Sequence, residues 1–432
     1  MPTCLCLKML EERQAMHKTF EIPLDIPDVM IEKVGTDRHG DFVITVKSTI
    51  EGTHCHTCGK KITKVYGYDR EITLRHLSIL GKQTFIRLRP VRYQCPFCDG
   101  NQTTTQQLSW YNPRSSYTKA YEEHILLGVV NSTVQDVCIK ENVGYEAIMG
   151  IIDRHIQAEV DWATFSRIDV IGIDEISLKK GHRDFVAIVT GRIDDKTVIL
   201  GVLSDRKKTT VKMFLSHIPH KLRKTITVVC SDMYDGFIYA AKEIFGKQVK
   251  IVIDRFHVAK LYRKGLDTLR KQELRRLKQE LSEEEYTHLQ GTMWALRKPE
   301  EKRTDEEKDL LERLFIYSPQ LKVAADVCNA LTELFEKNMT KRRAKFALKN
   351  WMKRVKDSTL HCFDTFLKTL EKWMDEIANY FLDRQTSGFV EGFNNKIKVI
   401  KRRCYGIVNV KHLFQRIHLD LSGYALFARK IR

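Results

Sequence analysis

The chain has 432 residues, of which 43% are hydrophobic, so it can hold two to four domains and at least one large core. Its formal charge of +18 indicates a polyanionic partner such as nucleic acid. No stretch approaches 18 uninterrupted apolar residues and the first twenty residues mix charged with apolar side chains, so we expect a soluble, intracellular protein with no membrane partner.

The N-terminal segment, residues 1–40, is irregular in pattern, and Pro23 and Pro27 interrupt any early helix. Apolar and polar residues then alternate as they do in strands. Such strands are predicted at residues 42–50, 71–77 and 83–88. We expect a small β domain at residues 41–110.

Two CxxC pairs lie in this domain and are separated by residues 59–94. The four cysteines are Cys55, Cys58, Cys95 and Cys98. Four thiolates can surround one tetrahedral Zn²⁺, and the gap leaves room for a β-hairpin. The alternatives are two coincidental pairs or a redox motif, but redox chemistry gives no reason for the second pair. We predict one structural Zn²⁺, because four protein ligands leave no open position. His54 and His56 are alternative ligands that we expect to face solvent or phosphate.

A helical pattern follows at residues 117–130, and residues 133–156 read as a short helix, a turn at 141–144 and a second helix. This resembles a helix-turn-helix, whose second helix can lie in the major groove of double-stranded DNA. Plain helix packing is the alternative. The preceding zinc domain and the basic chain favour a DNA-binding domain at residues 111–160.

The pattern changes to β from Asp169, with three apolar runs joined by short polar turns. A helix at 209–218 leads to a fourth strand, and the run KIVID gives a fifth. Three antiparallel strands followed by strand–helix units are the layout of an RNase H-like fold, which we place first at residues 165–262. Asp174 would leave the first strand and Asp232 the fourth, so that adjacent central strands bring the two carboxylates together.

Residues 263–383 lose the β signal and read as several amphipathic helices, an all-helical insertion into the catalytic fold. The catalytic domain resumes at 384–432 with a predicted helix over 385–402. On that helix Gly388, Glu391, Asn395 and Lys398 share one face.

Two glycines of that helix, Gly388 and Gly392, cost helix stability and make sense where DNA or another backbone comes close. A basic tract after Glu391 suits phosphate contacts. We assign these contacts to Lys398, Lys401, Arg402 and Arg403.

Asp174, Asp232 and Glu391 offer hard oxygen ligands suited to Mg²⁺ or Mn²⁺. A pair of such ions can clamp the attacking and leaving oxygens of a phosphodiester, which is chemistry that cuts DNA. Taken singly, an Asp after a strand is more often a cap, and Asp232 could cap a helix near Tyr234. Together with two upstream nucleic-acid modules, the three carboxylates favour a metal site.

The motifs as a set resemble DDE-type insertion-sequence transposases of the ISL-three group. The matching segments are CHTCGK, YQCPFC, the helix-turn-helix, GIDEIS, CSDMYDGF, VIDRFHVAK and SGFVEGFNNKIKVIKRRCYG. The resemblance covers nearly the whole chain after residue 40, and it selects Asp174 over the adjacent Glu175 as ligand. Asp254 and His257 match a family motif as well, and their role could be structural.

The resemblance implies a multidomain α+β protein with a zinc-binding domain, a helix-turn-helix and an interrupted RNase H-like catalytic domain. It implies a catalytic triad of Asp174, Asp232 and Glu391 holding two Mg²⁺ or Mn²⁺ ions, and recognition of terminal inverted repeats. We expect strand cleavage, strand transfer into target DNA, a homodimer on DNA and a bacterial, cytoplasmic, nucleoid-associated location. The alternatives are a non-catalytic DNA-binding regulator derived from a transposase, and a structure-selective RNase H-like nuclease.

Overall fold

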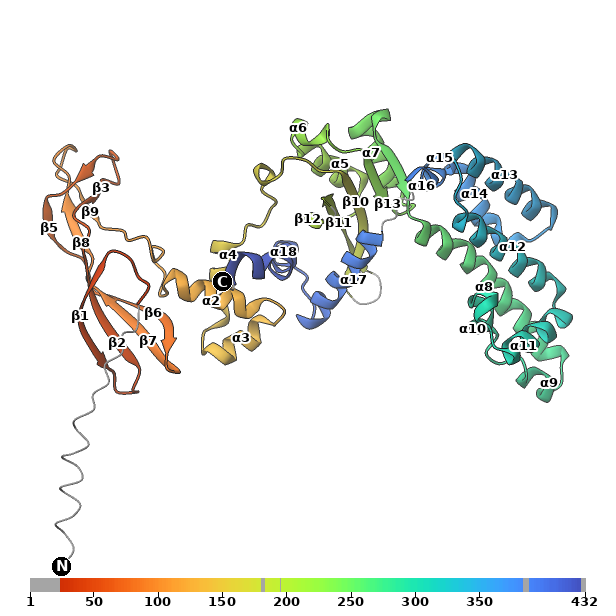
Figure 1. The fold of residues 1–432 in the computed structure, drawn as a ribbon, viewed down its shortest axis with the longest axis horizontal. Helices are drawn as coiled ribbons and strands as arrows, with labels where there is room; N and C mark the ends of the chain where they lie inside the picture. Colours follow the sequence, from red (N-terminus) through yellow and green to blue (C-terminus); the bar gives the residue numbers. More distant parts are fainter. Residues whose placement is uncertain (1–23, 180–182, 195, 384–387, 429–432) are drawn as a thin grey trace, which may run out of the picture. The chain divides into compact units, whose positions relative to one another are not determined.

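The computed structural model describes residues 24–179, 183–194, 196–383 and 388–428. The chain divides into two compact units, Met1–Gly128 and Val129–Arg432 (Figure 1). Cys4 and Cys6, like the rest of residues 1–23, lie outside the described part.

The first unit is built from β-strands. A four-stranded sheet has the order β1-β2-β7-β6, formed by Val29–Thr36, Phe42–Ser48, Lys82–Leu88 and Ile72–Ile79. Smaller sheets contain β3 (Thr53–His54) with β4 (Lys61–Ile62), and β5 (Val65–Tyr68), β8 (Val91–Gln94) and β9 (Thr103–Thr105). The predicted hairpin between the cysteine pairs is β6–β7, which turns at Leu80 and Gly81.

Strand β1 corrects the expectation that residues 1–40 are irregular. It pairs antiparallel with β2 through a register shift between Ile31 and Lys33. Most of its side chains, including Met30 and Val34, are exposed. The strand therefore depends on backbone pairing at a sheet edge, which leaves little apolar alternation in the sequence.

Helices α2 (Lys119–Val129), α3 (Val134–Glu141) and α4 (Tyr145–His155) follow. Thr133 caps α3 in a reciprocal capping box with Asp136. Asn142 ends this helix in the left-handed conformation, with φ of 51°. The α3–turn–α4 pair lies where the sequence predicted it, and it belongs to the second unit.

The second unit contains a mixed five-stranded sheet in the order β12-β11-β10-β13-β14. Its strands are Lys196–Val202, Arg183–Ile193, Val170–Lys179, Val228–Ser231 and Lys250–Ile253. β10, β11 and β12 form the predicted antiparallel meander, whereas β13 and β14 run parallel to β10.

Helices cover both faces of this sheet. On one face, α5 (Lys208–His217) and α7 (Asp235–Phe245) pack against Ile171, Ile173 and neighbouring residues. On the other, α17 (Gly388–Arg403) and α18 (Val410–Phe427) pack against Ile176 and its neighbours. Each face of the sheet buries its own apolar cluster, and the two clusters together hold the helices against the sheet.

The segment expected to be helical contains α8 to α16. These are Arg255–Glu280, Glu283–Thr287, Thr292–Arg297, Asp305–Tyr317, Pro319–Glu336, Lys341–Asp357, Asp364–Lys372, Met374–Ala378 and Tyr380–Asp383. Helix α8 starts directly after β14 and continues into the insertion, so the backbone has no break at the expected boundary near residue 262.

Short elements complete the second unit. They are α6 (His220–Arg223) and the 3-10 turns η2 (Trp162–Thr164), η3 (Gly246–Gln248), η4 (Glu300–Lys302) and η5 (His361–Phe363). Within the described ranges, no helix has the length and apolar content needed to cross a membrane.

Candidate functional site

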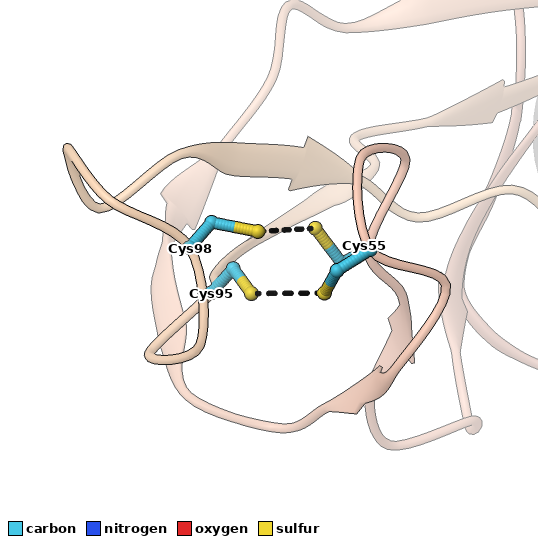
Figure 2. A group of neighbouring side chains, drawn as sticks. Cys55, Cys95 and Cys98 are labelled. Atoms are coloured by element: carbon cyan, nitrogen blue, oxygen red, sulfur yellow. Dashed lines mark hydrogen bonds between the residues drawn. The ribbon is translucent and has the colours of Figure 1, made fainter.

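The four predicted zinc ligands converge at one point in the first unit, as Figure 2 shows for Cys55, Cys95 and Cys98. Their sulfur atoms all lie within 4.8 Å of one another. The Sγ atoms of Cys55 and Cys98 are 3.8 Å apart, and those of Cys58 and Cys95 are 3.7 Å apart. Four sulfurs at about 2.3 Å from a tetrahedral Zn²⁺ would be about 3.8 Å from each other, so the geometry fits this ion.

The electrostatics of the cluster also favour a cation. Backbone N–H groups of Cys58 and Thr57 lower the pKa of Cys55 to about 6. The neighbouring sulfurs, that of Cys58 above all, raise the pKa of Cys98 to about 12. Four thiolates repel one another at this distance, and a bound metal ion removes that repulsion.

The two flanking histidines lie outside the sulfur cluster. His54 is an exposed residue of β3. His56 is also exposed, and its Nδ1 lies 2.9 Å from Oγ1 of Thr104. These positions agree with solvent-facing side chains, and the four sulfurs already complete a tetrahedral set.

In the second unit, three aspartates occupy equivalent positions at one edge of the sheet. Ile173 of β10 pairs with Ser231 of β13, and Ser231 pairs with Ile253 of β14. The next residues are Asp174, Asp232 and Asp254. Since neighbouring strands lie about 4.8 Å apart, the aspartates are adjacent at the carboxyl ends of the parallel pairs.

Asp174 does not leave its strand as expected, because β10 continues to Lys179 by pairing with β11. It lies instead where the other neighbour, β13, ends. Its Oδ1 accepts a hydrogen bond of 2.7 Å from the backbone N–H of Glu175. Its Oδ2 accepts from the side-chain amide of Asn394 on helix α17.

Burial and mutual repulsion disfavour the charged forms of both carboxylates. Burial, together with the nearby charge of Asp174, raises the pKa of Asp232 to about 6 although a hydrogen bond from Tyr234 N–H lowers it. Burial likewise raises the pKa of Asp174. His257 in the first turn of α8 acts on both pKa values in the opposite direction. A pair of carboxylates in this situation is suited to a divalent cation.

Asp254 has a structural partner at the same edge. It is 4% exposed, and its Oδ1 accepts a hydrogen bond of 3.0 Å from Phe256 N–H at the start of α8. It therefore caps the helix that leads into the insertion.

Glu175 points to the opposite side of β10 from Asp174, because side chains alternate along a strand. It forms an ion pair with Arg206, whose guanidinium lies over the rings of Phe185 and Tyr234. Glu175 is thus neutralised by a protein cation, whereas Asp174 forms no ion pair with another residue in the described part of the chain.

Glu391 lies in helix α17, but its side chain is outside the described part of the structure. Asn394 is three residues further along, which is the same side of a helix. Its contact with Asp174 therefore places this turn of α17 beside the two aspartates.

The four basic residues of α17 that were predicted to contact phosphate fall into two pairs. Lys398 and Arg402 are exposed. Lys401 is half-buried and its Nζ donates to the backbone oxygens of Ser177 and Leu178, and burial lowers its pKa. Arg403 is half-buried in an ion pair with Asp420 of α18. Lys401 and Arg403 thus already bind protein groups.

Helix α18 connects α17 to the helix-turn-helix. Asp420, fully buried at its carboxylate, accepts from Arg403 at 2.8 Å, from Arg416 at 3.2 Å and from the backbone N–H of Asn131 at 3.0 Å. Arg416 also donates to the carbonyl oxygens of Val129 and Ser132. One buried ion cluster therefore holds α17, α18 and the chain entering α3.

Sequence reasoning missed Asn394 and Arg206. It placed Asn395 on the Glu391 face, but Asn395 is exposed, and the neighbouring Asn394 is the asparagine buried against Asp174. A signal was present, since a polar Asn394 follows Phe393 on the apolar side of an amphipathic helix. Arg206 sits in a loop far from Glu175 along the chain and carried no signal.

Three family models match the chain in sequence order. They are a zinc-finger of transposase IS204/IS1001/IS1096/IS1165 at residues 51–98, a helix-turn-helix domain of transposase family ISL3 at 106–156, and a DDE-type transposase of the ISL3 family at 171–417.

Two relatives align over most of their length. The transposase for insertion sequence element IS1001 of Bordetella parapertussis is 24% identical over 386 residues, which cover 88% of this chain and 92% of the relative. The transposase for insertion sequence element IS1557 of Mycobacterium tuberculosis is 22% identical over 395 residues, or 86% of each chain.

Proposed function

The chain belongs to the ISL3 family of DDE transposases and is an insertion-sequence transposase, and on this premise we propose that Asp174, Asp232 and Glu391 form its metal-dependent catalytic site. The observation that carries the proposal is the meeting of three elements. Asp174 and Asp232 end adjacent parallel pairings, and Asn394 brings the Glu391 turn of α17 to Asp174. We infer that this sheet with its helices is an RNase H-like domain.

The donor set fits two divalent cations such as Mg²⁺ or Mn²⁺. Both aspartates are partly buried and repel each other, which a cation would offset. When bound, the ions supply positive charge that stabilises the attacking and leaving oxygens of a phosphodiester. Asn394 orients the Asp174 carboxylate by donating a hydrogen bond to Oδ2. Arg206 forms an ion pair with Glu175 on the other side of the strand.

The reaction we propose is hydrolysis at the ends of the element followed by attack of the freed 3′-hydroxyl on target DNA. Both steps are in-line displacements at phosphorus, so the same carboxylates serve both. Bringing two element ends together requires at least two copies of the chain on DNA, and we propose a homodimer.

Recognition of the terminal inverted repeats is proposed for the zinc domain and the helix-turn-helix. The first turn of α4 presents exposed Tyr145 and Glu146, which is where a recognition helix contacts base edges. Lys398 and Arg402 are the exposed basic residues of α17 proposed for backbone contacts. Phosphate contacts of this kind position DNA without reading its sequence.

The test compares Asp174→Asn, Asp232→Asn and Glu391→Gln with wild type on duplex DNA carrying the terminal repeat. Each variant should lose strand cleavage in Mg²⁺ while retaining binding of the repeat, because the transition-state clamp loses a ligand charge. Asp235→Asn is the matched control, since Asp235 is exposed and bound to Lys372. Near-normal cutting by a triad variant removes that residue from the site.

The same experiment separates the alternative, a DNA-binding regulator derived from a transposase. Such a protein would bind the repeat and leave it intact in Mg²⁺ or Mn²⁺. Cleavage by wild type that each triad variant abolishes rules that alternative out.

A further inference from the structure

Helix α13 (Lys341–Asp357) of the insertion has an unusual charge. Its 17 residues, KRRAKFALKNWMKRVKD, include eight Lys or Arg and a single Asp. Two hollows border its exposed side, one of them lined by Lys341, Arg342, Lys345, Phe346 and Lys349. Helix α11 of the same insertion, in contrast, starts with three acidic residues.

The cations of α13 divide into those with acidic partners and those without. Lys341 and Lys345 form ion pairs with Asp375, and Lys356 pairs with Glu371. Within the part of the chain that the structure describes, the other five are exposed and have no acidic partner. They are Arg342, Arg343, Lys349, Lys353 and Arg354.

The helix carries these charges on a rigid surface. Leu348 and Trp351 are buried beneath it, and the Trp351 Nε1 donates to the carbonyl of Val327 on α12 at 2.9 Å. At helical spacing Arg342, Phe346, Lys349 and Lys353 follow one another along the outer side. We call these four residues the α13 ridge. It is about 16 Å long at 1.5 Å per residue, which is about five base pairs of duplex DNA.

This arrangement opposes the stability of the isolated helix. Lys341, Arg342 and Arg343 occupy the first turn, where the helix dipole favours negative charge. Lys349 and Lys353 are like charges at a spacing of four, which repel. A polyanion lying along the ridge would offset both the repulsion between Lys349 and Lys353 and the unfavourable position of the cations in the first turn. Phe346, 68% exposed between the cations, offers an apolar contact to deoxyribose.

The ridge starts close to the catalytic sheet. Lys341, the first residue of α13, donates to Asn379 at 2.7 Å, and Asn379 donates to the backbone oxygen of Ile251 in β14 at 2.7 Å. β14 ends at Ile253, and the next residue, Asp254, lies on the same edge as Asp174 and Asp232. DNA held at that edge can continue onto α13.

We propose that the α13 ridge binds the phosphate backbone of duplex DNA outside the terminal repeat. The inference rests on the proposed function, because a transposase must hold DNA on both sides of the phosphodiester it cuts. Flanking DNA varies in sequence from one insertion to the next. A surface of lysine and arginine that contacts phosphates and no base edges is suited to DNA of variable sequence.

The test uses the full-length, zinc-loaded chain and two duplexes, the terminal repeat alone and the repeat extended by flanking DNA. Wild type should bind the extended duplex more tightly. The variant Arg342→Gln/Lys349→Gln/Lys353→Gln should lose most of that gain, roughly tenfold or more, and its dependence of log Kd on log salt should become shallower by about 3 at most. Binding to the repeat alone should not change.

The matched control is Lys278→Gln/Arg313→Gln/Lys322→Gln, which removes three exposed cations of α8, α11 and α12 that have no acidic partner among the described residues. The control should keep the gain, and both variants should retain the wild-type circular dichroism spectrum. Equal losses in both variants, or a ridge variant that keeps the gain, would overturn the proposal. If the ridge variant keeps the affinity gain from flanking DNA, the ridge would be assigned to an acidic protein surface instead of DNA.

Binding is measured in Ca²⁺, so it does not depend on strand cleavage. A wild-type chain that shows the gain and the ridge effect but never cuts in Mg²⁺ contradicts the proposed catalytic site and leaves the ridge standing. A chain that cuts normally without any gain from flanking DNA contradicts the ridge alone.

Discussion

Replacing Asp232 with Asn should stabilise the metal-free protein while abolishing cleavage. Burial and the neighbouring Asp174 raise the pKa of Asp232 from its ordinary 3.8 to about 6. The folded protein therefore opposes ionisation of this carboxyl. Asn is close in shape to the neutral acid, and its oxygen can still accept the 2.9 Å hydrogen bond from Tyr234 N–H.

The magnitude follows from the pKa difference between folded and unfolded chains. Each pH unit corresponds to about 1.4 kcal/mol, so ionised Asp232 lowers the free energy of unfolding by about 3 kcal/mol above pH 7. Because this pKa is raised, wild-type stability falls as pH increases from about 4 to about 6 and is then constant. The advantage of Asp232→Asn should be near 3 kcal/mol at pH 8, about half of that at pH 5, and absent below pH 4.

The assay is urea denaturation of the full chain, stripped of divalent cations but zinc-loaded, followed by tryptophan fluorescence at pH 8 and pH 5. Four of the five Trp residues lie in the second unit, so the signal reports mainly on the unfolding of that unit. Asp235→Asn serves as control and should bring no gain, since Asp235 is exposed and paired with Lys372. Mg²⁺ should stabilise wild type more than Asp232→Asn. A variant less stable than wild type at pH 8, or a difference that does not vary with pH, refutes the reasoning.

Three further substitutions test other parts of the structure. Cys58→Ser should release zinc and unfold the small domain, because such a site supplies much of a small domain's folding free energy. Elemental analysis and circular dichroism measure this, and a full zinc content in the variant would contradict it. Gly392→Ala should stabilise α17 by up to about 1 kcal/mol, since no described atom lies within 4 Å of an added Cβ. If DNA passes close to Gly392, the same variant should cleave more slowly, and normal cleavage kinetics would exclude a DNA contact at this residue. Asp420→Asn should destabilise the second unit by about 3–5 kcal/mol in urea denaturation, because it leaves Arg416 buried without its partner; a loss below 1 kcal/mol would contradict the buried cluster.

The parts of the fold that the sequence predicts well are those in which local pattern and burial agree. The meander and β13 are continuous apolar runs because both faces of the sheet are covered. The position of Asp232 followed directly, since it comes after such a run. The cysteine pairs required only spacing, because a zinc ion selects ligand type and geometry more than sequence context.

The features that the sequence did not indicate depend on contacts between residues distant in sequence. β1 exists through pairing with β2, and its exposed side chains leave no pattern. The basic tract of α17 looked uniform, yet Lys401 turns to the carbonyl oxygens of β10 and Arg403 to Asp420. Tertiary packing decides which of these cations face solvent, and the local sequence does not indicate it.

The ion cluster at Asp420 gives the helix-turn-helix and the proposed catalytic site a common support. The carboxylate binds the backbone at Asn131, just before α3, and binds Arg403 at the end of α17. Helix α17 carries Glu391 and, through Asn394, the hydrogen bond to Asp174. Since the cluster is buried, moving either partner away from Asp420 leaves an uncompensated charge, which costs several kcal/mol. The position of α3 and α4 on DNA and the position of the Glu391 turn are therefore linked through α18. A substitution in this cluster should alter both repeat binding and cleavage.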